Sequence, residues 1–166
     1  MKDLFINKWW GNYIGGCDDS FLLLDYFGTS PASTWTLRQI FEDMHLDLAL
    51  ESGDIENSDL YFEQEKGYEP HFDMAIDVVI DLSAILLECL HNQQVVIKNL
   101  DESTKYRKTI IISASKQDIL LLKNGLDKFI NTPLSFDLAN MMSENDLTEL
   151  IHDCKAVSNE LNIFTD

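Results

Sequence analysis

The segment from Pro70 to His91 places the strongest constraint on how this chain can fold. Proline is common in the first turn of a helix, because its φ angle fits and its missing N–H is not needed there. Apolar side chains then cover most of the circumference of the predicted helix, so it must be buried on nearly every side. These residues are Phe72, Met74, Ala75, Ile76, Val78, Val79, Ile80, Leu82, Ile85, Leu86, Leu87 and Leu90. We therefore predict a central core helix over 70–91.

Four further segments combine apolar residues at helical spacing with capping residues, and they cover 20–28, 34–48, 115–130 and 143–161. Two β-branched runs on either side of a polar connector predict a β-hairpin around 94–113. A chain of 166 residues is long enough for one compact domain with a hydrophobic core. We predict an α+β fold that is predominantly helical, with four to five helices and one hairpin in a single domain over residues 1–166.

Capping residues set the expected ends of three of these helices. Gly28 is predicted to close the first one, because glycine commonly follows the last helical residue. Ser115 is predicted to cap the helix that follows it, and Pro133 to stop that helix. Ser143 and Asp146 have the spacing of a capping box at the start of the last helix.

Negative charge is abundant and unevenly distributed. The chain has 29 acidic and 12 basic residues, which gives a net charge of −17. Residues 42–81 hold 13 of the acids and one base, Lys66, and so carry −12 of that charge. A field of this sign repels nucleic-acid phosphates and anionic lipids and attracts basic proteins. We predict a basic protein partner and no direct contact with nucleic acid or membrane.

Three of these acids lie on the predicted central helix. Asp73, Asp77 and Asp81 are four residues apart, so they are expected to share one face of the helix. They could form its only solvated stripe, a stripe that binds a protein, or a carboxylate cluster for a metal or for catalysis. The preceding segment, 51–69, is interpreted as a long surface loop with a short element near 60–62. Its candidate partner-binding residues are Glu51, Asp54, Glu56, Asp59, Glu63 and Glu65.

The sequence lacks the motifs that would indicate a specific chemistry. It contains no P-loop, Rossmann fingerprint, His-Glu-x-x-His pair or Cys/His zinc spacing. We therefore predict no enzyme activity, no cofactor and no metal. Cys17, Cys89 and Cys154 are far apart and odd in number, which favours free thiols in a reducing compartment. Since no secretory signal or membrane span is predicted either, we expect a cytoplasmic protein.

Two segments carry a resemblance to a known group of proteins. They are WWGNYIGGCDDS, residues 9–20, and PHFDMAIDVVIDL, residues 70–82. Together they resemble small bacterial immunity proteins of polymorphic-toxin systems, in particular those of contact-dependent growth inhibition. The resemblance implies a cytoplasmic protein that binds the C-terminal toxin domain of a large exported protein and blocks it. Such toxins are often nucleases, whose substrate grooves are basic.

The charge and the resemblance together give a hypothesis for the mechanism. An acidic surface can occupy a basic active site built for phosphates, and charge complementarity raises both the association rate and the specificity. We expect Asp73, Asp77 and Asp81 to form the ordered part of that surface and the loop acids its adaptable part. Two alternatives remain open at this point. One is a metal-dependent hydrolase that uses the three aspartates with His71, and the other is an acidic mimic of nucleic acid that inhibits DNA-binding proteins.

Overall fold

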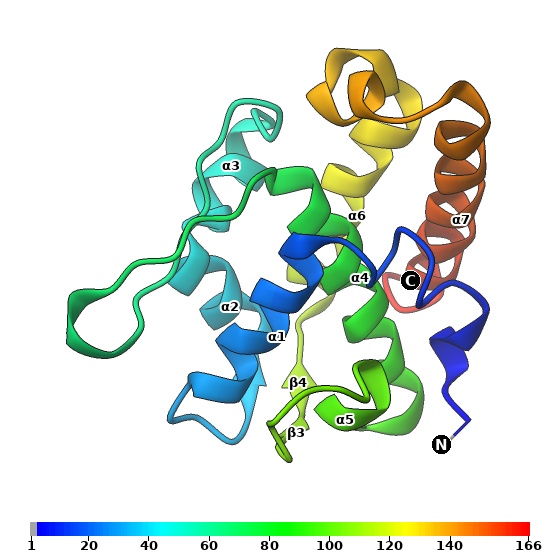
Figure 1. The fold of residues 1–166 in the computed structure, drawn as a ribbon. Coiled ribbons are helices and arrows are strands. Elements are labelled where there is room, and N and C mark those ends of the chain that lie inside the picture. The colour runs from blue at the N-terminus through cyan, green and yellow to red at the C-terminus, as the bar shows by residue number, and fades with distance from the viewer. Residues whose placement is uncertain (1–2) are drawn as a thin grey trace.

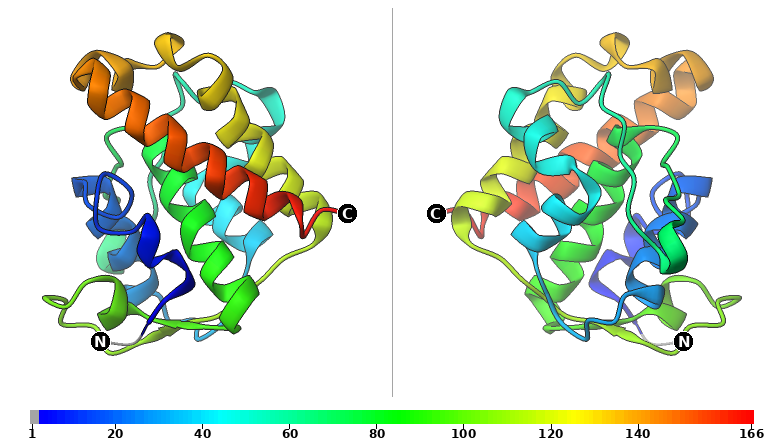
Figure 2. Two further views of the ribbon diagram at one scale, coloured as in Figure 1. Left: turned by 90° about the vertical axis from the view of Figure 1, so that its right-hand side faces the viewer. Right: turned by 90° about the vertical axis from the view of Figure 1, so that its left-hand side faces the viewer.

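The computed structural model describes residues 3–166 and places one long helix at the centre of the protein. This helix, α4 (Ala75–Asn92), is buried at every position from Ala75 to Cys89. It packs against α1 (Asp18–Thr29), α6 (Lys116–Asn131) and α7 (Glu144–Asn162), as Figure 1 shows. Figure 2 shows α7 crossing the face of the molecule formed by α4 and α6. The prediction of a central core helix is therefore confirmed.

The start of α4 differs from the sequence prediction. The helix begins at Ala75, and Pro70 lies five residues earlier in extended chain. The backbone N–H of Phe72 donates to the carbonyl of Leu60 at 2.9 Å, and those of Asp73 and Met74 donate to the carboxylate of Asp19. These tertiary hydrogen bonds hold the segment before Ala75 outside the helix, which the local sequence could not indicate.

The helix predicted over 34–48 is two helices. α2 (Leu37–Met44) and α3 (Leu46–Ser52) are separated by His45, whose φ of 64° is in the left-handed region that ends a helix. Thr36 caps α2 by accepting a hydrogen bond from the N–H of Gln39. The break turns Leu48 outward, where 70% of its surface is exposed, although the helical spacing had placed it in the core.

The predicted hairpin is present, and a second strand pair accompanies it. β2 (Val95–Val96) pairs antiparallel with β3 (Thr109–Ile110), and the one-turn helix α5 (Ile97–Leu100) begins their connection. β1 (Trp35–Thr36) pairs in parallel with β4 (Ile112–Ser113) and joins the start of α2 to the hairpin. Strands of two residues are too short to produce an alternating pattern, so the sequence predicted only the hairpin.

Two predicted caps are confirmed and one predicted helix end is wrong. The hydroxyl oxygen of Ser115 accepts from the N–H of Asp118 at 3.1 Å, and that of Ser143 accepts from the N–H of Asp146 at 3.1 Å. Gly28 does not close α1, which continues to Thr29. A Cβ at position 28 would lie 2.4 Å from the ring of Tyr106, so this glycine provides room for an aromatic side chain.

Four 3-10 helices complete the described secondary structure: η1 (Phe5–Lys8), η2 (Glu65–Gly67), η3 (Pro133–Ser135) and η4 (Asp137–Met141). The three cysteines are free thiols, as predicted. Within residues 3–166, none of the helices has both the length and the apolar character needed to span a bilayer. The fold is α+β and predominantly helical, with seven α-helices in the described chain where the sequence predicted four to five.

Candidate partner-binding surface

The three aspartates predicted to share one stripe have different surroundings. Asp73 precedes α4 and is exposed, whereas Asp77 and Asp81 have only 3% and 2% of their surfaces accessible. The prediction of a solvated or partner-binding stripe is therefore wrong for these two residues. Because α4 is enclosed on its apolar faces by other helices, its polar face was expected to meet solvent. The N-terminal segment, residues 9–20, covers that face instead.

Hydrogen bonds from the N-terminal segment satisfy both buried carboxyl groups. The hydroxyl of Tyr13 donates to Asp77 Oδ1 at 2.7 Å. The backbone N–H of Gly15 donates to Asp81 Oδ1 at 2.9 Å, and the hydroxyl of Ser20 donates to Asp81 Oδ2. Buried polar groups are stable only when they are paired in this way. The two segments that carry the sequence resemblance, 9–20 and 70–82, are therefore one hydrogen-bonded unit in the fold.

A third buried carboxylate lies at the N-terminal end of α4. Asp19 is 3% exposed, and its two oxygens accept the backbone N–H groups of Asp73 and Met74 at 2.8 and 3.0 Å. The partial positive charge at a helix N-terminus favours an anion at this position. The N-cap of α1 is Cys17, and Asp19, in the first turn of α1, binds the N-terminal end of α4.

Burial changes the protonation of the two carboxyl groups on α4. Desolvation, followed by a hydrogen bond with Asp19, raises the pKa of Asp77 from 3.8 to about 8. Desolvation likewise raises the pKa of Asp81 to about 7, although the hydrogen bonds from Ser20 and Gly15 act in the opposite direction. Both carboxyls therefore take up protons near neutral pH, and together they contribute less negative charge than the sequence implies.

Glu88 extends the buried polar face of α4 toward its C-terminal end. It is fully buried, and its two oxygens accept hydrogen bonds from the N–H of Ile6, at 3.1 Å, and from the side-chain amide of Asn92. Residues before and within the N-terminal segment thus cover α4 from Asp77 to Glu88. The carboxylates of α4 hold the chain together internally and are inaccessible to a partner protein.

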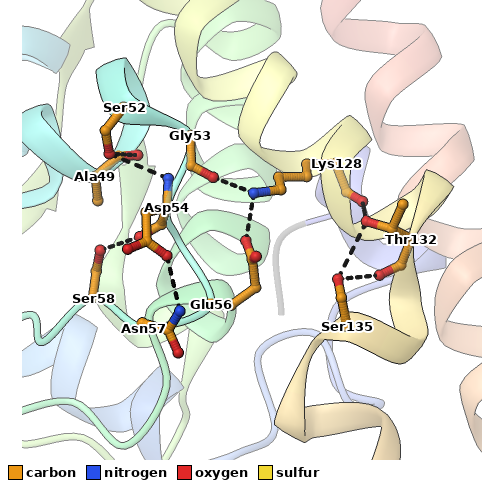
Figure 3. Close-up of polar contacts among 10 residues, drawn as sticks. All are labelled: Ala49, Ser52, Gly53, Asp54, Glu56, Asn57, Ser58, Lys128, Thr132 and Ser135. Atoms are coloured by element: carbon orange, nitrogen blue, oxygen red, sulfur yellow. Dashed lines mark hydrogen bonds and ion pairs between the residues drawn. The ribbon is translucent and has the colours of Figure 1, made fainter.

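The predicted loop acids fall into two groups, of which the first is fixed by ion pairs. Glu51 lies in α3 and pairs with Arg38 at 3.1 Å, and Arg38 also binds Asp118 at 2.6 Å. Figure 3 shows the neighbouring loop, where Lys128 of α6 binds Glu56 at 2.7 Å and donates to the carbonyl of Gly53. Glu56 is partly buried, so this ion pair anchors the loop to the body of the protein.

Asp54 and Asp59 belong to the same anchored region. Asp54 Oδ1 accepts from the side-chain amide of Asn57 at 3.1 Å, a contact also drawn in Figure 3. Asp59 lies 3.0 Å from His71 Nδ1. His71 in turn stacks on Tyr61, with ring centroids 4.8 Å apart, and Tyr61 stacks on His45 at 4.2 Å. The predicted loop is therefore ordered by specific contacts over much of its length.

Beyond this region the chain forms an arm, which we define as residues 60–72. Figure 1 shows it projecting from the body of the protein beside α1 and α2. An isolated bridge joins Tyr61 to His71, which confirms the short element expected near 60–62, and η2 forms the tip. Glu63, Glu65 and Glu69 are exposed on the arm, and none of them forms an ion pair with a described side chain.

A groove lies between the arm and the C-terminal ends of α1 and α2. Its volume is about 740 Å³, and its acidic lining residues are Asp43, Glu63, Glu65 and Glu69. The structure thus brings together two predicted residues, Glu63 and Glu65, with two that the prediction had not selected. Asp43 and Glu69 belong to the acidic run 42–81, but their proximity depends on the folding back of the arm, for which the sequence gives no signal.

The described residues offer little support for metal chemistry at the aspartates. Among residues 3–166, no group of three or more His, Cys, Asp and Glu side chains has a geometry that could hold a metal ion. The alternative hydrolase site required Asp73, Asp77, Asp81 and His71 to converge. His71, on the arm, instead contacts Asp59, while Asp77 and Asp81 accept hydrogen bonds from the N-terminal segment.

Comparison with protein families gives a match to the model of "Immunity protein 68" over residues 5–161. This match spans nearly the whole chain. The protein belongs to this immunity-protein family. Comparisons with curated proteins and with solved structures find no significant match. The predicted resemblance to polymorphic-toxin immunity proteins is confirmed at the level of the family, while the assignment to contact-dependent growth inhibition stays a prediction.

Membership in the Immunity protein 68 family implies a toxin as the partner, so the accessible acids of this chain become the relevant ones. Of the nine residues predicted to bind the toxin, Asp77 and Asp81 are buried, Glu51 and Glu56 are held in ion pairs, and Asp59 contacts the imidazole of His71. Asp54 bonds to a neighbouring amide, whereas Asp73, Glu63 and Glu65 are exposed. Among the nine predicted residues, those that are exposed without an ion pair or a hydrogen bond from a described side chain therefore lie on the arm and, in the case of Asp73, just after it.

Proposed function

We propose that this immunity protein binds a cognate toxin domain through the acidic surface around the arm and thereby neutralises it. The observation that supports this proposal is the set of exposed acids on the arm, Glu63, Glu65 and Glu69, none of which is neutralised by a described basic side chain. Unpaired exposed charge of one sign steers a partner of the opposite sign and sets the orientation in which it docks.

The partner with the best electrostatic fit is a basic nuclease domain. A substrate groove that binds phosphates is lined by Lys and Arg, and a projecting acidic arm can enter it and exclude the nucleic acid. The inhibition is then steric and electrostatic, and it requires no chemical step by the immunity protein. We place the protein in the cytoplasm of the producing cell, in a system of the contact-dependent growth-inhibition type.

The decisive experiment is calorimetric titration of the protein against the C-terminal toxin domain encoded immediately upstream of its gene. We expect 1:1 binding with a nanomolar Kd at low salt and weaker binding at moderate salt, because salt screens the exposed charges. In parallel, the nuclease activity of the toxin domain should fall in proportion to the bound fraction. Absence of binding at micromolar concentration would contradict the proposal for that neighbour.

The proposal that the protein is not an enzyme has its own test. Thermal unfolding should give the same Tm with and without added Mg²⁺, Mn²⁺ or Zn²⁺, because a metal that binds only the folded state would raise it. A large rise in Tm with one of these ions would instead favour the hydrolase alternative.

A further inference from the structure

The groove between the arm and α2 contains a carboxylate that is already oriented before any partner arrives. Asp43 lies in the last turn of α2, and the hydroxyl of Tyr26 donates to its Oδ2 at 2.6 Å. Burial and this hydrogen bond raise the pKa of Tyr26, so the hydroxyl keeps its proton and remains a donor. Oδ1 of Asp43 accepts no hydrogen bond from a described residue, and Asp43 is exposed on the groove.

The lining of this groove is negative on two sides. Asp43 stands on the α2 side, and Glu63, Glu65 and Glu69 stand on the arm. The C-terminal end of α2, at Met44, adds the negative pole of a helix dipole. Among the described side chains that line the groove, none is a lysine or an arginine. α1 also ends here, but its last carbonyls already bind the ammonium of Lys108. The carboxylates of Asp43 and of the arm are therefore the groove acceptors without an ion pair to a described side chain.

The described ring contacts that join the arm to the body of the protein lie near its base. Its base is held by the stacked rings of His45, Tyr61 and His71. Closer to the tip, one long hydrogen bond of 3.4 Å joins the side-chain amide of Gln64 to Thr29 of α1. A fixed carboxylate on one wall thus faces three acids on a wall that is held mainly at its base. The volume of about 740 Å³ lies in the range of roughly 300–1,000 Å³ that is typical of ligand sites.

We propose that this groove receives an arginine side chain presented by a basic segment of the toxin, with the guanidinium bound between Asp43 and the acids of the arm. Arginine fits better than lysine, because its planar fork of five donors can serve several carboxylates at once, whereas an ammonium is a compact point charge. Arginine is also enriched among the residues that dominate interface energies. The inference rests on the proposed function, since it names the chemistry that the toxin must present.

The first test does not depend on the toxin. The ¹⁵N-labelled protein is titrated with the blocked peptide Gly-Arg-Gly-Arg-Gly and with its lysine counterpart, and backbone shifts are followed by NMR. We expect saturable shifts at Asp43, His45 and 63–69 with the arginine peptide, and a several-fold weaker response to the lysine peptide. Asp43→Asn should abolish these shifts. Equal shifts at the other acidic groove, beside Asp146, Glu149 and Asp153, or equal binding of the two peptides would overturn the proposal.

The second test uses the neighbouring toxin domain and matched variants. Asp43→Asn and the triple variant Glu63→Gln, Glu65→Gln, Glu69→Gln should each weaken toxin binding by about 30-fold or more, as expected for residues at the centre of an interface. The control variant Glu102→Gln, Glu144→Gln, Glu149→Gln removes the same charge from exposed positions elsewhere and should change Kd less than about 3-fold.

The two tests separate the groove from the proposed function. If the toxin binds the wild-type protein and the groove variants equally well, the groove and the acidic surface of the arm are both wrong as contacts, while toxin neutralisation through another surface stands. A different result is possible, in which the wild-type protein does not bind the toxin domain but the arginine peptide still shifts the groove residues in the NMR titration. The groove would then be an arginine-binding site, and the proposed function would fail for that neighbour.

Discussion

The carboxylates of α4 and those of the arm come from one acidic stretch of sequence, yet their surroundings are opposite. Asp77 and Asp81 are enclosed and receive hydrogen bonds from residues 13–20, whereas Glu63, Glu65 and Glu69 are exposed. The difference depends on what covers each segment rather than on its composition. A carboxyl group can be buried where another part of the chain supplies donors, and it remains outside where nothing does.

The largest effect that would test this comparison comes from charge reversal inside the protein. In the wild-type protein the Gly15 N–H and the Ser20 hydroxyl donate to the carboxylate of Asp81. Asp81→Lys replaces this acceptor with an ammonium, which can only donate. The free energy of unfolding should fall by about 3–5 kcal/mol, as for other broken buried polar pairs. Urea denaturation would measure it, with Asp73→Lys at an exposed position as the control, expected within about 0.5 kcal/mol of wild type. Similar stabilities of the two variants would show that Asp81 is not buried in solution.

The pH dependence of stability should also report the two buried carboxyls. Their pKa values are about 8 for Asp77 and about 7 for Asp81 in the folded protein, above the ordinary value of 3.8. The folded state therefore binds more protons than the unfolded chain between roughly pH 4 and 8. Stability should be greatest below this window and fall as pH rises through it, by at most about 1.4 kcal/mol per pH unit for each group.

The variant Asp77→Asn, Asp81→Asn isolates that contribution. At position 77 the amide oxygen can still accept from the hydroxyl of Tyr13, and at position 81 it can accept from the Gly15 N–H while the amide NH2 donates to the hydroxyl oxygen of Ser20. Neither amide carries a titrating proton. Urea unfolding at pH 5, 6.5 and 8 should show a flatter profile for the variant, which should exceed wild type in stability at pH 8. Parallel profiles for the two proteins would mean that neither carboxyl has a raised pKa.

A smaller effect is expected where the acidic loop is tied to the body. Lys128→Met removes the ion pair with Glu56 and the hydrogen bond to the Gly53 carbonyl while keeping the volume of the side chain. Leaving the partly buried Glu56 without its partner should cost about 1–3 kcal/mol. Hydrogen exchange should become faster over residues 53–58 and stay unchanged on the arm. The double variant Lys128→Met, Glu56→Gln should recover part of the loss.

The smallest change in stability is expected on the arm. Replacing Glu63, Glu65 and Glu69 together by glutamine removes exposed charge that has no described ionic partner, so the free energy of unfolding should stay within about 0.5 kcal/mol of wild type. Thermal unfolding at low and moderate salt would check this. A loss of more than about 1.5 kcal/mol would show that these acids support the fold as the carboxyls of α4 do.

The sequence predicted those parts of the fold that depend on neighbouring residues. The apolar surface of 75–90 identified the central helix, and Ser115 and Ser143 identified two helix starts, because periodicity and capping are local. Segments 9–20 and 70–82 also predicted the broad class of immunity proteins, which the family match over residues 5–161 confirms.

The sequence could not show which segment covers a polar face. Asp77 has the spacing of a solvated stripe, and its burial depends on Tyr13, 64 residues away in the chain. The same limit applies to the groove, since Asp43 and Glu69 become neighbours only when the arm folds back. At the site, the acidic charge could be predicted, whereas the division into buried, paired and free acids required the tertiary structure.

The base of the arm also affects how related chains can diverge. Phe62 and Pro70 are buried and hydrogen-bonded to each other at 3.3 Å, so the chain leaves and re-enters the body at adjacent points. Residues 63–69 can therefore be lengthened, shortened or exchanged without moving either end. The unit formed by 9–20 and α4 has no such freedom, because a change on one side requires a matching change on the other. Under the proposed function, the tip of the arm is the part of the interface that can change without disturbing the contacts between residues 9–20 and α4.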